Sequence, residues 1–315
     1  MALVEARDLV KRFGSLTAVD GISFAVDRAE VVGFLGPNGA GKSTAMKIIS
    51  GFLEPTSGQA YIEGYNSHTQ PIEARRRLGY LPEGAPAYGD MSVADFLGFI
   101  AGMHGMSKRQ ANDRLAELVE RIGLAEVWNQ RIEALSKGFK RRVGIAQALV
   151  HDPDVLILDE PTDGLDPNQK HDMRELIRLI ASRKAIVIST HILEEVEAVC
   201  TRAIIIAKGR MLADATPAEL LARSQGANAF AITIATADPQ RAIEIISTQP
   251  GISKVYVAER VDGVTRLLVH APQNRPTVAE LAGVLGRSDI AVSEMFVKHA
   301  SLDDVFRQIT NGAEN

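Results

Sequence analysis

Cysteine is nearly absent from this chain of 315 residues, which contains a single one, Cys200. One cysteine excludes an internal disulfide and is typical of a protein in a reducing compartment. Val196 and Val199 precede it at helical spacing. We therefore expect Cys200 to pack on an apolar helix face and to have no redox role.

Long apolar runs are also missing. No stretch approaches the ~20 apolar residues that a membrane-spanning helix needs, and the start, Met1 to Arg7, lacks the apolar core of a secretory signal. If the protein serves a membrane, we expect another chain to form the path. The net charge of −4 gives no general attraction to nucleic-acid phosphates. The basic run Lys140–Arg142 could form a local contact with nucleic acid, but a solvated helix face is the simpler interpretation.

The remaining composition, with 46% apolar and 23% charged residues, is that of a soluble globular protein of two domains. Strand and helix patterns alternate over residues 1–222, with a helical insert at about 84–150. A linker is expected at 223–228. An accessory domain then follows over 229–315.

Local signals mark where several elements begin. A turn at Asp20-Gly21 is expected before a strand over 22–26. Within the insert, two serines are each followed three residues later by an acidic or amide side chain. This is the spacing of a capping box at the start of a helix. They are Ser92 with Asp95 and Ser107 with Gln110.

The last part of the chain follows another order. We expect, in turn, a strand over 229–235, a helix over 239–249, strands over 252–259 and 265–270, a helix over 277–285 and a strand over 290–297. This βαββαβ order predicts a small α+β ferredoxin-like domain. It carries no catalytic cluster, which favours a packing or dimerisation role.

A glycine-rich loop between a buried strand and a helix matches G-x-x-x-x-G-K-[ST] at Gly36, Gly41, Lys42 and Ser43. Glycines let backbone N–H groups turn toward phosphate oxygens, and the helix that follows adds the positive end of its dipole. Lys42 would neutralise the β- and γ-phosphates, and Ser43 would ligate Mg²⁺. We expect the phosphates to be held by Gly36, Asn38, Gly39, Ala40, Gly41, Lys42, Ser43 and Thr44.

Two adjacent acids end the apolar strand Val155–Leu158. Asp159 at the carboxyl end of this strand can hold Mg²⁺ through water. Glu160, one residue further, can act as the general base on the attacking water. The pair predicts hydrolysis, and it argues against a module that only binds nucleotide.

With these motifs the chain resembles the ATP-binding subunit of an ATP-binding-cassette (ABC) transporter. The resemblance covers residues from about 3 to 222 and is closest to export-type, single-cassette subunits, including those linked to gliding motility and copper-site maturation. It also rests on Gly79-Tyr80-Leu81-Pro82-Glu83, Leu135-Ser136-Lys137-Gly138-Phe139, Gly164-Leu165-Asp166-Pro167, Ser189-Thr190-His191 and Ser301-Leu302-Asp303-Asp304-Val305-Phe306.

The resemblance implies a phosphate-loop NTPase cassette that binds ATP and Mg²⁺ between two copies, or between this chain and a homologous subunit. Ser136 and Gly138 would contact the γ-phosphate of the opposite subunit, and Asp166 would bridge the two sites. His191 would help to position the attacking water. Phe13 would stack on adenine, although a core phenylalanine is the simpler alternative. Catalytic roles are implied for Glu160, His191 and Lys42, and metal contacts for Ser43, Glu83 and Asp159.

The chain departs from the family pattern at three positions. Lys137 and Phe139 replace the third and fifth residues of Leu-Ser-Gly-Gly-Gln, whereas Glu83 stands where glutamine is usual. Glu83 can still accept a hydrogen bond from metal-bound water, but it adds a negative charge near Mg²⁺.

The implied function is to drive a separate membrane permease from the inner face of the cell membrane through ATP-driven closing and opening of the dimer. Gly84 to Tyr88 could dock on that permease or form an ordinary surface turn. Two alternatives stay open: a soluble cassette ATPase that acts on the ribosome or nucleic acid, and a nucleotide-gated binding module.

Overall fold

The structure is a computed structural model that describes residues 2–85, 87–222, 229–236, 238–261, 263–271, 277–298 and 301–312. The chain divides into two compact units, Met1–Pro217 and Ala218–Asn315. The expected linker 223–228 lies outside the described residues.

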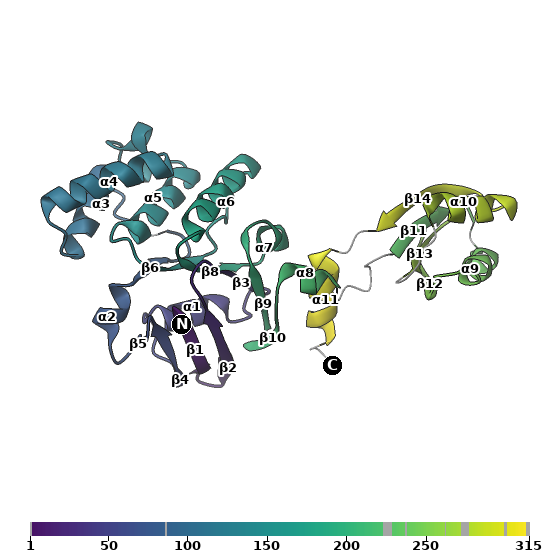
Figure 1. The fold of residues 1–315 in the computed structure, drawn as a ribbon, viewed down its shortest axis with the longest axis horizontal. Coiled ribbons are helices and arrows are strands. Elements are labelled where there is room, and N and C mark those ends of the chain that lie inside the picture. Colours follow the sequence, from purple (N-terminus) through teal and green to yellow (C-terminus); the bar gives the residue numbers. More distant parts are fainter. Residues whose placement is uncertain are drawn as a thin grey trace. The chain divides into compact units, whose positions relative to one another are not determined.

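A six-stranded sheet forms the centre of the first unit, in the order β10-β9-β3-β8-β7-β6 (Figure 1). Its strands are β3 (Val31–Leu35), β6 (Leu78–Leu81), β7 (Val155–Asp159), β8 (Ala185–Thr190), β9 (Arg202–Ala207) and β10 (Arg210–Ala215). All pairs are parallel except β9 with β10. The apolar runs of β3, β7 and β8 are fully buried, as strands covered on both faces require.

A second, antiparallel sheet has the order β2-β1-β4-β5, with β1 (Val4–Phe13), β2 (Leu16–Val26), β4 (Ser57–Ile62) and β5 (Tyr65–Asn66). The expected turn at Asp20-Gly21 is wrong, because β2 continues through it. Leu9 pairs with Ile22 and Val10 with Asp20, which leaves Gly21 as an extra residue at φ +76°. Gly21 is therefore a β-bulge, a feature with the same local glycine signal as a turn.

Helix α1 (Lys42–Ile49) packs between the two sheets, and its buried side chains join a core shared by strands of both. The other helices of this unit outside the insert are α2 (Pro71–Arg75), α6 (Pro167–Ala181) and α7 (Leu193–Val199). Among the described residues, no helix combines the length and the apolar character that crossing a membrane demands.

The helical insert contains α3 (Val93–Met103), α4 (Lys108–Ile122) and α5 (Lys137–Leu149), with 3-10 turns at Ala125–Val127 and Ile132–Ala134 (Figure 1). Both expected caps are present. Ser107 and Gln110 form a full reciprocal capping box. Ser92 accepts a hydrogen bond from the backbone N–H of Asp95, but the Asp95 carboxylate accepts from the Ser92 hydroxyl instead of the backbone.

The second unit begins with the end of α8 (Pro217–Ala222) and contains β11 (Ala229–Ile234), α9 (Gln240–Ser247), β12 (Lys254–Val261), β13 (Val264–His270), α10 (Val278–Arg287), β14 (Val292–Lys298) and α11 (Leu302–Gly312). Its antiparallel sheet has the order β12-β13-β11-β14. The predicted βαββαβ order is confirmed, and this strand order is the one of a ferredoxin-like sheet.

Candidate functional site

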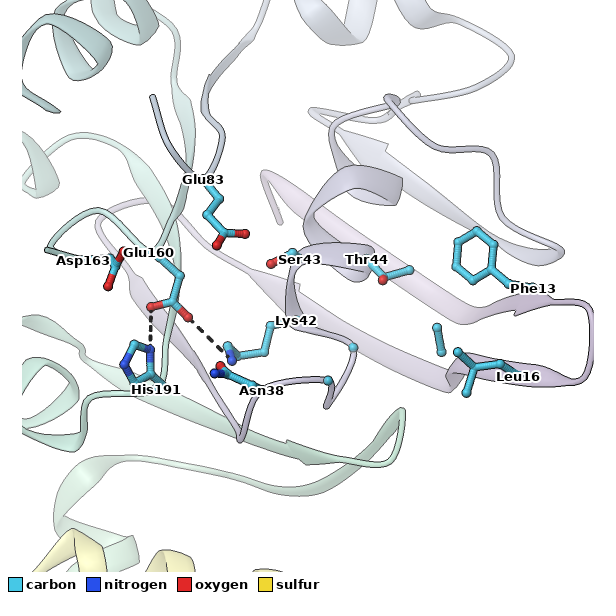
Figure 2. A pocket seen from close by; sticks show the side chains of 13 residues that line it. Phe13, Leu16, Asn38, Lys42, Ser43, Thr44, Glu83, Glu160, Asp163 and His191 are labelled. Carbon is cyan, nitrogen blue, oxygen red and sulfur yellow. Dashed lines mark hydrogen bonds and ion pairs between the residues drawn. The ribbon is translucent and has the colours of Figure 1, made fainter. Parts of the chain in front are cut away.

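The carboxyl ends of three parallel neighbours, β3, β8 and β7, meet at one edge of the central sheet. Such an edge is where open α/β sheets bind ligands. A pocket of about 590 Å³ opens there, within the range of small-molecule sites. It is lined by Phe13, Leu16, Ala18, Asn38, Gly39, Gly41, Lys42, Ser43, Thr44, Glu83, Glu160, Asp163 and His191 (Figure 2).

The loop after β3 has a backbone that only glycine permits at two places. A Cβ on Gly41, which has φ +106°, would lie 2.3 Å from the carbonyl oxygen of Ala18, and one on Gly36 would lie 2.4 Å from that of Ile206. Lys42 is buried and its Nζ donates to the carbonyl oxygen of Gly36 at 2.9 Å. The loop thus curls around the ammonium group, which lies where a phosphate chain would be neutralised. Of the expected phosphate contacts, Gly36 and Ala40 shape the loop without lining the pocket.

Asp159 is buried behind the pocket and hydrogen-bonds to Ser43, which lines it. Asp159 Oδ1 accepts from the Ser43 hydroxyl at 3.2 Å and also from the Ser189 hydroxyl. The second carboxylate oxygen, Oδ2, is buried and has no hydrogen-bond partner. A buried, unsatisfied carboxylate oxygen beside a serine hydroxyl suits the hard oxygen ligands that Mg²⁺ prefers. These residues therefore fit a magnesium site, with Glu83 on the same pocket wall.

Glu160 lies between the His191 imidazole and the Lys42 ammonium group. Its Oε2 is 2.9 Å from His191 Nδ1, and its Oε1 is 3.5 Å from Lys42 Nζ (Figure 2). The backbone is held at φ +49°, an unfavourable region for a side chain with a Cβ, and its N–H donates to Ser189. Such strain occurs where the fold fixes a side chain for function.

Burial raises the pKa of Glu160, although His191 and Lys42 oppose that shift. A general base works only when ionised, so its acid limb should follow this raised pKa. We expect ATP turnover to fall, as the pH is lowered, at a higher pH than the ordinary glutamate pKa of about 4.3 would give. A pH profile of kcat/KM, which follows the ionisation of the free enzyme, tests this, with unfolding followed at each pH. A turnover that stays constant through that region would contradict the assignment.

Ser136, Gly138 and Asp166 do not join the pocket within one chain. Ser136 is exposed and caps α5 by accepting from the N–H of Phe139 at 3.3 Å. Asp166 is exposed and caps α6 through the N–H of Gln169 at 2.9 Å. Gly138 is buried, and a Cβ there would lie 2.9 Å from the Gln169 side chain.

Several site features were missed in the sequence, among them Asp163, which lines the pocket. Ser189 links the two adjacent acids, because its hydroxyl donates to Asp159 and accepts from the Glu160 N–H. Its position at the carboxyl end of β8, next to β7, was a usable signal. Arg141 was expected on a solvated face and is buried instead, since α5 turns it toward the sheet. Phe13, expected to stack on adenine, and Glu83, expected to contact the metal, both line the pocket.

Together, the glycine loop around a buried lysine, the serine–aspartate pair and the glutamate–histidine pair define the site of a phosphate-loop nucleoside triphosphatase cassette. Residues 19–163 match the family described as ABC transporter. The chain is 35% identical over 311 residues to the Nod factor export ATP-binding protein I of Burkholderia lata, covering 98% of this chain and 97% of that protein. The chain belongs to the ABC transporter family, as an ATP-binding subunit.

Other similarities agree with this membership. The chain is 37% identical over 223 residues to the "Probable multidrug ABC transporter ATP-binding protein YbhF" of Escherichia coli, covering 70% of this chain but only 38% of that protein. A solved structure, described as "Structure of ATP binding subunit of ABC transporter", has 33% identity and a TM-score of 0.65 over 70% of this chain and 92% of its own. The predicted cassette fold is confirmed.

Proposed function

We propose that this chain hydrolyses ATP with Mg²⁺ to power a separate, export-type membrane permease. The observation that carries the proposal is the arrangement of Glu160 between Lys42 and His191, beside the Ser43–Asp159 pair. When bound, Mg²⁺ would supply charge neutralisation at the phosphate oxygens. Ser43 and Asp159 would hold it, Lys42 would hold the β- and γ-phosphates, and Glu160 would take a proton from the attacking water.

Two copies, or this chain and a homologous subunit, would form each complete site. Ser136 and Asp166 are exposed N-caps of α5 and α6, so a second subunit could reach both side chains. The Ser136 hydroxyl would contact the γ-phosphate held by the other subunit's loop, and Asp166 would bridge the sites. An interface built this way is isologous, with the same patch used twice.

The permease would dock beside Glu83, on apolar side chains of the insert. Tyr88, Phe99 and Met103 are 57%, 44% and 71% exposed, and the rings of Tyr88 and Phe99 meet edge to face at 5.9 Å. Exposed aromatic groups that gather in this way are typical of protein interfaces. The expected docking segment Gly84–Tyr88 falls partly outside the described residues, because it contains Pro86. Such docking would put the chain on the inner face of the cell membrane, and the name of the Nod factor export relative supports export as the direction of transport.

A recovery experiment tests this function. Tagged Glu160→Gln protein with ATP is captured from detergent-solubilised native membranes and identified with its partners by mass spectrometry. We expect a stoichiometric protein with several membrane spans. The matched control is the double variant Glu160→Gln, Lys42→Ala. It should recover less of this membrane protein, because it cannot hold the phosphates of ATP. Recovery with ribosomes or DNA, or with no membrane protein, would favour the soluble alternatives.

A further inference from the structure

Two adjacent arginines of α5 have opposite surroundings. Arg142 is half-buried, and its Nη2 lies 2.8 Å from the carboxylate of Asp172. Arg141 is only 6% exposed. Within the described part of the chain it makes no ion pair or hydrogen bond, and its Nη1 is buried without a partner. An arginine stays charged, and a buried charge without a partner destabilises a fold, so stability alone does not explain Arg141.

The packing of α5 on β6 places Arg141 beside the segment that carries Glu83. A Cβ on Gly79 would lie 2.2 Å from the carbonyl oxygen of Ala148, and one on Gly144 would lie 2.5 Å from the Leu81 side chain. The chain then turns, with the Ala85 N–H donating to the carbonyl oxygen of Pro82, and the same Cβ on Gly144 would lie 3.1 Å from the Ala85 Cβ. Because Arg141 lies one helical turn before Gly144 on the same face of α5, the turn that carries Glu83 packs beside it.

The acids around Arg141 are those of the catalytic pocket. Burial lowers the pKa of Arg141, and Asp163 and Glu83 are the first two acids that oppose this shift. Both line the pocket, whereas Arg141 does not. Figure 2 shows the Glu83 carboxylate extended into the space beside Ser43 and Glu160. The pocket thus carries one carboxylate more than a site with glutamine at position 83, and Arg141 is the nearby unpaired cation.

We propose that Arg141 is a positioning residue, the buried counter-charge of Glu83, and that the two tie the start of α5 to the metal-facing loop after β6. The inference rests on the proposed function, because it assigns a role within that ATP site. A change in charge or position at Glu83 would then be transmitted through Arg141 to α5. That helix begins at Ser136, the residue assigned to the opposite subunit's ATP.

A charge cycle on the purified full chain tests the pair with Arg141→Gln, Glu83→Gln and the double variant. We expect Arg141→Gln to lose about tenfold or more in turnover, because the Glu83 charge is then left without its counter-charge beside the phosphates. The same change should weaken ATP binding in EDTA several-fold, since the pocket becomes more negative. Adding Glu83→Gln should restore both quantities to within about threefold of wild type. Because Arg141 has no partner to lose, the melting temperature should change by no more than a few degrees.

The adjacent arginine supplies the matched control. Arg142→Gln breaks a paired contact, so it should lower the melting temperature, and Glu83→Gln should not rescue it. The pair assignment is overturned if Arg141→Gln keeps wild-type turnover, if Glu83→Gln fails to rescue it, or if Asp163→Asn rescues it equally well. Arg141→Met is the second variant if the glutamine does not fold. Wild-type turnover and membrane recovery are measured separately, so a failed cycle is distinguishable from a failed transport function.

Discussion

Replacing Glu160 by glutamine should slow ATP hydrolysis by about 10²- to 10⁴-fold, the usual contribution of a general base. Glutamine keeps the size of the side chain but cannot take a proton. The positions of Lys42 and Ser43 on the phosphate loop do not depend on that proton, so ATP binding should remain. A complex that binds but does not turn over should accumulate as the ATP-bound dimer.

Hydrolysis is measured in single-turnover assays, ATP binding by titration, and dimer formation from the mass given by light scattering. Lys42→Ala is the matched comparison, because it should lose ATP binding and dimerisation together. Near-normal turnover of Glu160→Gln would remove the base assignment. Loss of ATP binding in Glu160→Gln would instead mean that Glu160 supports nucleotide binding through its ion pair with Lys42.

Contiguous signals explain why much of the fold was predictable. Each of the main motifs is a short contiguous stretch of sequence. These motifs are the glycine loop, the apolar strand before Asp159 and the segment around the serine at the start of α5. Their local chemistry fixes their local structure. The ferredoxin-like order was likewise readable, because its strands and helices keep distinct periods. Short elements such as β5 and β10 were not predicted, because their pairing comes from partners far along the chain.

The missed features of the site have the same cause. The burial of Arg141 depends on glycines at 79 and 144 that let α5 lie close to β6, a contact between segments about 65 residues apart. Ser189 gains its two acid contacts only when β8 pairs with β7. The expected role of Ser136 has another limit. Its partner would be a second subunit, so one chain shows its exposure and its cap but not its contact.

Mixing two inactive variants should restore activity if each site is shared between subunits. Lys42→Ala removes the phosphate contact of one subunit's own loop. Ser136→Asp keeps a good helix cap but places a negative charge against the γ-phosphate of the other subunit. We expect each variant alone to lose about 100-fold or more, the size of a lost transition-state contact. In a mixed dimer, one site has both defects and the other has neither.

Lys42→Ala should not pair with itself, whereas ATP at the one intact site can still close the mixed dimer, so turnover in the mixture should come from mixed dimers. Different tags on the two variants allow the mixed dimers to be isolated and assayed alone, where about half is expected. The Ser136→Ala variant separates the lost hydroxyl from the added charge. If isolated mixed dimers stay as inactive as either variant, Ser136 does not complete the opposite site, and each chain must hydrolyse ATP with its own residues.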